Sequence, residues 1–149
     1  MSMKTRSIIF IICLLTMACE NDDYPHAEVP SVVLNEFWTE FPNATDVDFK
    51  PEEPNIKVRF KHDGRKLSAL INRSGQILKQ KEQISWEGLP VQIQEFLTRE
   101  FRKENIEDPE LVISGDTVYY QVQVRRFLGD ENLVVDRQGR LDSTRTFFQ

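Results

Sequence analysis

One six-residue turn occurs twice in the chain and constrains the fold more than any other feature of the sequence. The first copy is Asn72-Arg73-Ser74-Gly75-Gln76-Ile77, and the second, 64 positions later, is Asp136-Arg137-Gln138-Gly139-Arg140-Leu141. Each follows a short apolar run, Leu70-Ile71 or Val134-Val135. An Asn or Asp followed by a Gly that tolerates positive φ, between extended segments, is typical of a β-hairpin. The sequence therefore predicts two hairpins of the same kind.

A helix is predicted ahead of each hairpin. Pro30 and Pro90 each open a segment whose apolar residues recur at helical spacing, and a proline's missing N–H costs nothing in a first helical turn. Trp38 lies beside the first apolar stripe and is expected in the core, whereas Trp86 is expected to seal the joint between the two halves. We predict that the core contains the following helix and strand residues: Phe37, Phe41, Leu97, Phe101, Val58 and Val122.

The strands repeat with the same offset as the turns. Ile56–Lys61 and Tyr120–Arg125 both alternate between apolar and polar residues, which is the period of a half-buried strand. We predict an α+β fold: a tandem repeat of two α-β-β-β-β units, about residues 29–85 and 86–149. The two units would form one antiparallel sheet of eight strands with both helices on one face. A single unit of this size would be marginally stable, and joining two also removes an exposed edge from each.

The first 18 residues have the pattern of a bacterial lipoprotein signal peptide. Lys4 and Arg6 precede an apolar run that is too short to span a bilayer, and Thr16-Met17-Ala18-Cys19 resembles a lipobox. We expect lipidation at Cys19, then an acidic tether over residues 19–28. The membrane would be contacted through the lipid alone, in the cell envelope, with the domain facing either the periplasm or the surface.

The charge of the mature chain narrows the class of partner. The formal net charge of −5 becomes −7 once Lys4 and Arg6 leave with the signal peptide. Nucleic-acid binding needs a basic stripe, so an acidic domain argues against it. Cys13 leaves with the signal peptide and Cys19 carries lipid, so no disulfide is available to the domain.

The alternation in the strands predicts a polar sheet face. If Ile56, Val58 and Phe60 face the helices, the residues between them face away, and the same holds for the second strand. The candidate partner-binding residues on this helix-free face are Lys57, Arg59, Lys61, Tyr119, Gln121, Gln123 and Arg125. Antiparallel sheets often leave one face in water, so an ordinary solvated face is one interpretation. A docking surface is the other, since Tyr and Arg often dominate binding energy at interfaces.

No catalytic constellation stands out. The histidines, His26 and His62, have no metal-ligand spacing, and a His/Cys zinc site is excluded without a thiol. Asp46 and Asp48 open a strand and are too few for a calcium loop. We therefore expect no catalytic residue, metal site or cofactor.

The chain as a whole resembles the PepSY-like, β-lactamase-inhibitor-like domains of small exported bacterial lipoproteins. The resemblance rests on the lipobox, the Pro30-started helix, the turns at Asp63-Gly64 and Asn72–Gly75, and the Leu89-Pro90 helix start. It implies binding to, or inhibition of, a hydrolase, and it supplies no catalytic residues. We expect a non-enzymatic module that binds an envelope protein or peptide through its helix-free face. A structural lipoprotein with no specific ligand remains the alternative.

Overall fold

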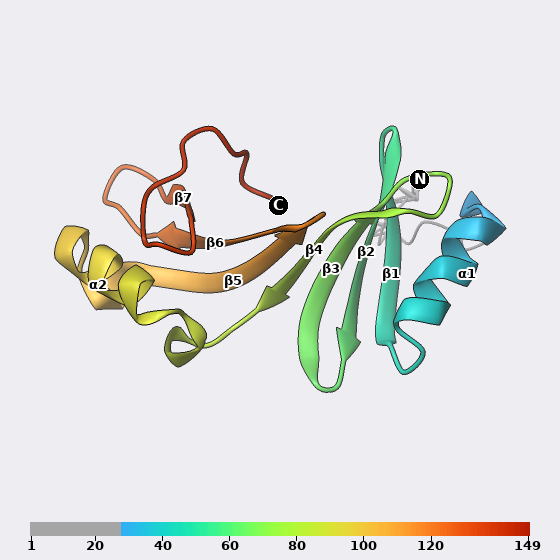
Figure 1. Cartoon of the computed structure of the whole chain (residues 1–149), viewed down its shortest axis with the longest axis horizontal. Coiled ribbons are helices and arrows are strands. Elements are labelled where there is room, and N and C mark those ends of the chain that lie inside the picture. Colours follow the sequence, from blue (N-terminus) through green and yellow to red (C-terminus); the bar gives the residue numbers. More distant parts are fainter. Residues whose placement is uncertain (1–27) are drawn as a thin grey trace, which may run out of the picture.

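Within the described residues, the strands join one antiparallel sheet in sequence order, from β1 to β7 (Figure 1). The computed structural model describes residues 28–149, so the predicted leader, Cys19 and nearly all of the tether lie outside the described residues. The elements are α1 (Ser31–Glu40), β1 (Thr45–Glu52), β2 (Asn55–His62), β3 (Arg65–Ile71), β4 (Ile77–Gln83), α2 (Val91–Glu100), β5 (Ile106–Ser114), β6 (Thr117–Val124) and β7 (Glu131–Val135). Short 3₁₀ turns occupy Trp86–Gly88 and Lys103–Asn105.

The predicted α+β class is confirmed, but the sheet has seven strands and not eight. After the second turn, Leu141 makes a single bridge to Val135, and the Asp142 amide then donates to the Val134 carbonyl at 2.8 Å. The Asp142 carboxylate accepts hydrogen bonds from both the amide and the hydroxyl of Thr144. Such a local side-chain turn competes with strand pairing. The chain therefore leaves the sheet where an eighth strand would begin.

The doubled turn folds in the same way in both places. The side-chain oxygen of Asn72 accepts from the amides of residues 74 and 76 at 3.0 and 2.9 Å. That of Asp136 accepts from the amides of residues 138 and 140 at 2.9 and 3.0 Å. Gly75 and Gly139 both have positive φ, as the hairpin pattern requires. Because the second half lacks its fourth strand, the tandem repeat itself stays a prediction.

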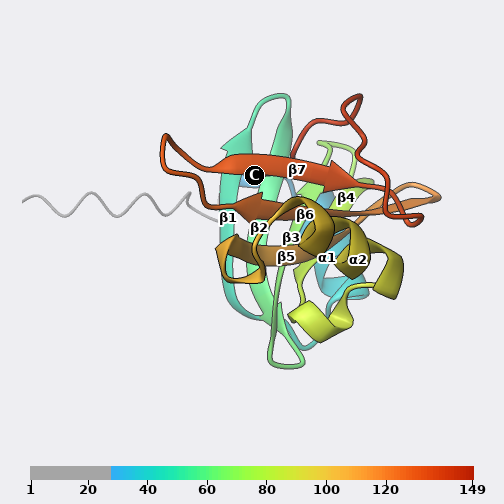
Figure 2. The same cartoon turned by 90° about the vertical axis from the view of Figure 1, so that its left-hand side faces the viewer.

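Both helices pack on the same face of the sheet. Cross-strand pairing links Val58 to Ala69, Gln80, Ile113 and Val118 in turn, and paired residues point to the same side. α1 covers Val58 and its neighbours, and α2 covers Val122, which shares a side with Val118 because side chains alternate. The helices lie at opposite ends of the long axis, because α1 packs on β1 to β3 and α2 on β6 and β7 (Figure 1). The sheet twists between these two groups of strands (Figure 2).

The predicted core is mostly correct. Phe37, Leu97, Val58 and Val122 are fully buried and Phe41 is nearly so, while Phe101 is half-buried against the second core cluster. The prediction for Trp38 is wrong, since 39% of this residue is exposed. Successive residues in a helix lie about 100° apart. Phe37 fills the centre of the core, and Trp38 meets only the edge of the cluster, with ring centroids 5.0 Å apart.

Trp86 lies in the 3₁₀ turn between β4 and α2, and its predicted sealing of a joint between two halves stays a prediction. Its half-buried ring packs on the second cluster, and the Lys103 ammonium lies 5.0 Å from the ring centroid.

Within residues 28–149, neither helix has the length and apolar character of a membrane span.

Candidate binding face

The pairing register defines a second face of the sheet that carries no helix. Arg59 pairs with Ser68, Ser68 with Lys81, Lys81 with Val112 and Val112 with Tyr119, so all five point away from the helices. We call this side the helix-free face. Alternation adds Lys57 and Lys61 from β2, and Gln121 and Gln123 from β6. Arg125 follows the end of β6 and pairs with Glu107 on β5.

The helix-free face is not bare, because residues 142–149 lie across it. This C-terminal segment covers Tyr119 and Gln121, which are only 2% and 0% exposed. Phe148 joins Val112, Tyr119 and Val134 in a third hydrophobic cluster on this face. Tyr119 and Gln121 therefore lie on the predicted face but are covered by the C-terminal segment, and their part in partner binding stays a prediction.

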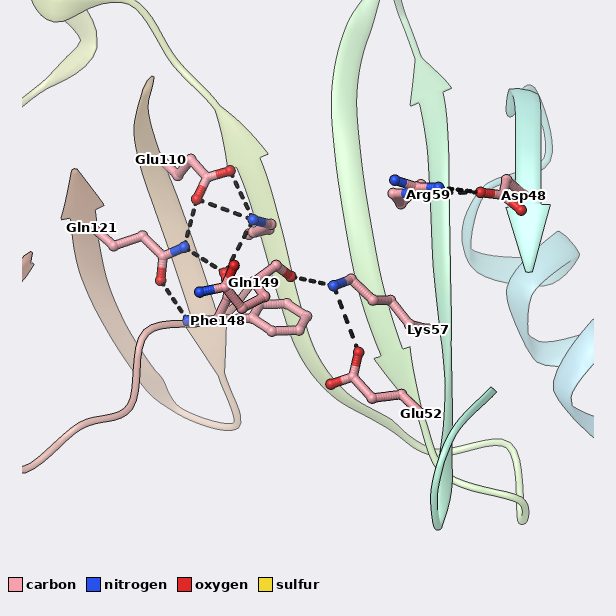
Figure 3. Close-up of polar contacts among 9 residues, drawn as sticks. Asp48, Glu52, Lys57, Arg59, Glu110, Gln121, Phe148 and Gln149 are labelled. Atoms are coloured by element: carbon pink, nitrogen blue, oxygen red, sulfur yellow. Dashed lines mark hydrogen bonds and ion pairs between the residues drawn. The ribbon is translucent and has the colours of Figure 1, made fainter. Parts of the chain in front are cut away.

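Gln121 binds the backbone of the segment from both sides. Its Oε1 accepts from the Phe148 amide at 3.0 Å, and its Nε2 donates to the Phe148 carbonyl at 2.7 Å (Figure 3). Nε2 also donates to the Glu110 carboxylate. Glu110 in turn pairs with Lys81, at 2.9 Å, and the Lys81 ammonium donates to the same Phe148 carbonyl at 3.0 Å. Side chains of β4 and β6, linked through Glu110 on β5, thus hold the backbone N–H and C=O of Phe148.

The Phe148 ring lies among lysine ammoniums. The Nζ atoms of Lys57, Lys79 and Lys81 lie 5.5, 5.7 and 5.6 Å from its ring centroid. Cations at this range are attracted to an aromatic face. Lys57 also donates to the Gln149 carbonyl and lies 3.5 Å from Glu52 (Figure 3).

The start of the segment is held by Asp142 and Arg145. Hydrogen bonds from the Thr144 hydroxyl and the Arg145 guanidinium lower the pKa of the Asp142 carboxyl. Arg145 also stacks over the Tyr119 ring, with its Cζ 5.0 Å from the centroid. Burial raises the pKa of the Tyr119 hydroxyl, and the positive charge of Arg145 partly offsets that effect.

The other predicted cations are paired with carboxylates. Arg59 donates twice to Asp48, at 2.6 and 3.2 Å, and Lys61 lies 2.7 Å from Asp46. These pairs are largely exposed to water, where an ion pair contributes little to stability. The two strand-start aspartates therefore serve as partners for β2.

Two adjoining hollows open beside the segment. The first, of about 300 Å³, is lined mainly by β2 to β5 and includes Arg59, Lys61 and Ser68. The second, of about 380 Å³, reaches β6 and includes Phe147 and Gln149. The two share the following residues: Lys66, Lys81, Gln83 and Glu110. Together they form a groove that begins beside Phe147 and Gln149.

Sequence reasoning missed several residues of this face: Lys66, Lys79, Lys81, Glu110 and Phe148. The alternation of Lys79-Gln80-Lys81 on β4 was a usable signal for two of them. His62 lies at the end of β2, 3.6 Å from Asp63 and against the Phe41 ring. Among residues 28–149, no three His, Cys, Asp or Glu side chains gather as a metal site would require.

Solved structures place this architecture among known folds. The chain matches a BLIP-like protein from Bacteroides fragilis with a TM-score of 0.63 at 17% identity, over 75% of this chain and 82% of that one. The fold is BLIP-like. A DUF2874 family protein from Bacteroides ovatus matches with a TM-score of 0.66 at 17% identity, over 75% and 83% of the two chains. A “putative periplasmic” protein from Bacteroides eggerthii gives 0.72 at 11% identity, over 76% and 85%.

The likeness to these three structures is one of fold alone, since the sequence identities are 11% to 17%. No protein-family model matches the chain, and no curated protein matches it. None of these three neighbours is described as an enzyme. The β-lactamase-inhibitor-like part of the predicted resemblance is supported at the level of fold, and its PepSY part stays a prediction.

Proposed function

We propose that the chain is a non-enzymatic binding module of the bacterial cell envelope, which presents its helix-free face to a protein or peptide partner. One neighbour is named BLIP-like and another “putative periplasmic”, which supports both the kind of activity and the location. The family resemblance of the sequence favours a hydrolase as the partner and inhibition as the effect of binding.

The observation that carries this proposal is the groove on the helix-free face. Its walls come from neighbouring strands of a rigid sheet, and its rim carries the exposed side chains of Arg59, Lys61 and Lys66. Within the described residues, the Lys66 ammonium has no ion-pair partner. Cations at a rim mainly speed the encounter with an acidic partner, while buried contacts supply the affinity.

We predict that replacing the rim cations reduces partner capture. The full chain and an Arg59→Ala, Lys61→Ala, Lys66→Ala variant would each be used as bait in an envelope extract. We expect the variant to recover the partner at least fivefold less well at low salt, because electrostatic steering is lost. A recovered hydrolase should also turn over its substrate more slowly when wild-type chain is added.

A matched control removes the same charge on the other side of the molecule. Arg99, Arg102 and Lys103, at and after the end of α2, would be replaced by alanine, and capture should stay at the wild-type level. Equal recovery by all three baits, or recovery of nothing, would contradict binding through this face. It would favour the structural lipoprotein with no specific ligand.

Lipid anchoring at Cys19 belongs to the same proposal. Several acyl chains, each contributing about 0.8 kcal/mol per buried CH₂, hold a protein at a membrane far more firmly than one chain does. We predict that cells fed a radiolabelled fatty acid will label the wild-type chain and that Cys19→Ser will abolish the label. A labelled Cys19→Ser chain would show that the lipid is attached elsewhere.

A further inference from the structure

The C-terminal segment occupies the helix-free face without being part of the sheet. Its contacts run across the strands: Arg145 meets Tyr119 on β6, Phe148 meets Lys81 on β4, and Gln149 meets Lys57 on β2. An added strand would instead run along one neighbour and exchange backbone hydrogen bonds with it. The segment thus lies on the face as a separate peptide would.

The hydrogen bonds that hold the segment also resemble those of a separately bound peptide. Within the described residues, the last hydrogen bond between backbone groups joins Asp142 to Val134. Beyond it, the backbone is held by side chains of the sheet, chiefly Gln121, Lys81 and Lys57. A segment held by so few groups can open locally while the sheet stays folded.

The chemistry of the site describes the ligand that fits it. Gln121 is completely buried, and its amide offers one donor and one acceptor to the backbone of a single residue, Phe148. The cluster below and the lysine ammoniums around it accept an aromatic ring. Phe147 packs only at the margin of this cluster, where it stays partly exposed. The site therefore suits an extended peptide with one aromatic side chain.

The groove supplies room for a ligand longer than the segment itself. The second hollow is lined by Phe147 and Gln149, so it starts beside the bound segment, and it continues into the first hollow through Lys66 and Lys81. A peptide that placed its aromatic residue in the position of Phe148 would extend along this groove. It could gain contacts there that the segment does not make.

We propose that residues 145–149 are an internal ligand, and that the partner is an extended peptide segment that displaces them by inserting its own aromatic side chain. This inference rests on the proposed function and adds its regulation. The apparent affinity for the partner is the intrinsic affinity multiplied by the fraction of molecules in which the face is uncovered. Opening of the segment then sets the apparent affinity.

The test uses the full chain and a probe of known sequence. A fluorescent, end-blocked peptide, Ser-Thr-Arg-Thr-Phe-Phe-Gln, corresponds to residues 143–149. By fluorescence anisotropy, the Phe148→Ala chain should bind it at least tenfold more tightly than wild type, because its own segment no longer fills the ring site. Thr146→Ala, an exposed change in the same segment, should behave as wild type does. A probe with Ala in place of the second Phe should not bind.

Hydrogen exchange on the wild-type chain tests the inference even if Phe148→Ala does not fold. The Phe148 amide should exchange at least a hundredfold faster than the amide of Val122 in the core. Equal protection would mean that the segment opens only with global unfolding and would overturn the inference. So would equal probe binding by wild type and a folded Phe148→Ala chain. A wild-type dimer that Phe148→Ala abolishes would assign the site to a second copy instead and overturn the proposed partner.

The two proposals fail in different ways. Tight probe binding without any partner from an envelope extract would contradict the proposed function and leave the internal ligand in place. Capture of a partner that Phe148→Ala does not strengthen, and that the probe peptide does not compete away, would contradict the internal ligand and leave the proposed function.

Discussion

Phe37→Ala should destabilise the domain by about 3–5 kcal/mol, the range measured for removing a large aromatic side chain from a core. Phe37 is completely buried, and its ring centroid lies 5.0 to 5.4 Å from those of four aromatic neighbours. These rings come from α1, the residue that follows it, β1 and β2, so the cavity cannot close by moving one side chain. A small domain has only about 5–15 kcal/mol in total. Urea unfolding followed by circular dichroism would measure the loss.

Phe127→Ala is the matched control, because it deletes the same atoms from a side chain that is 101% exposed. Exposed substitutions away from special backbone positions usually change stability by no more than about 0.5 kcal/mol. Similar losses for the two variants would contradict the placement of Phe37 at the centre of the first core cluster.

The sides of the strands could be predicted from the sequence because strand side chains alternate with a fixed period of two. Ile56, Val58 and Phe60 required one face, so Lys57 and Arg59 had to take the other. The helices were predictable for a similar reason, since their apolar stripes have a fixed period. The helical period did not determine which of two neighbouring aromatic residues, Phe37 or Trp38, fills the core. This is why the prediction of a buried Trp38 is wrong.

The eighth strand and the covered face could not be predicted in the same way. The chain leaves the sheet because of a local hydrogen-bonded turn at Asp142, which competes with strand pairing that the repeat pattern favoured. The contact between Phe148 and Gln121 joins residues 27 positions apart in a segment without periodicity. Two consecutive phenylalanines near the end of a polar stretch were the signal available, and they did not reveal which surface they meet.

Gly139→Ala should destabilise the domain by about 2–5 kcal/mol, the sum of a backbone cost and a packing cost. Gly139 has a φ of +78°, where an L side chain adds about 1–2 kcal/mol of strain. An added Cβ would also lie 2.5 Å from the Gln92 carbonyl oxygen, in the backbone of α2. Relieving that overlap requires moving the helix or the turn, and overpacking of this kind costs about 1–3 kcal/mol. Equilibrium unfolding in urea would measure the total.

Gly64→Ala separates the two costs. Gly64 has a φ of +75°, almost the same as Gly139, but an added Cβ there would meet nothing within 4 Å. This variant should lose only the backbone term, about 1–2 kcal/mol, so the difference between the two variants measures the contact between the second turn and α2. If both lost the same amount, the turn and α2 would not be packed as closely as the structure has them. In that case the positive φ of the turn alone would explain why position 139 is a glycine, and contact with α2 would not be needed to explain it.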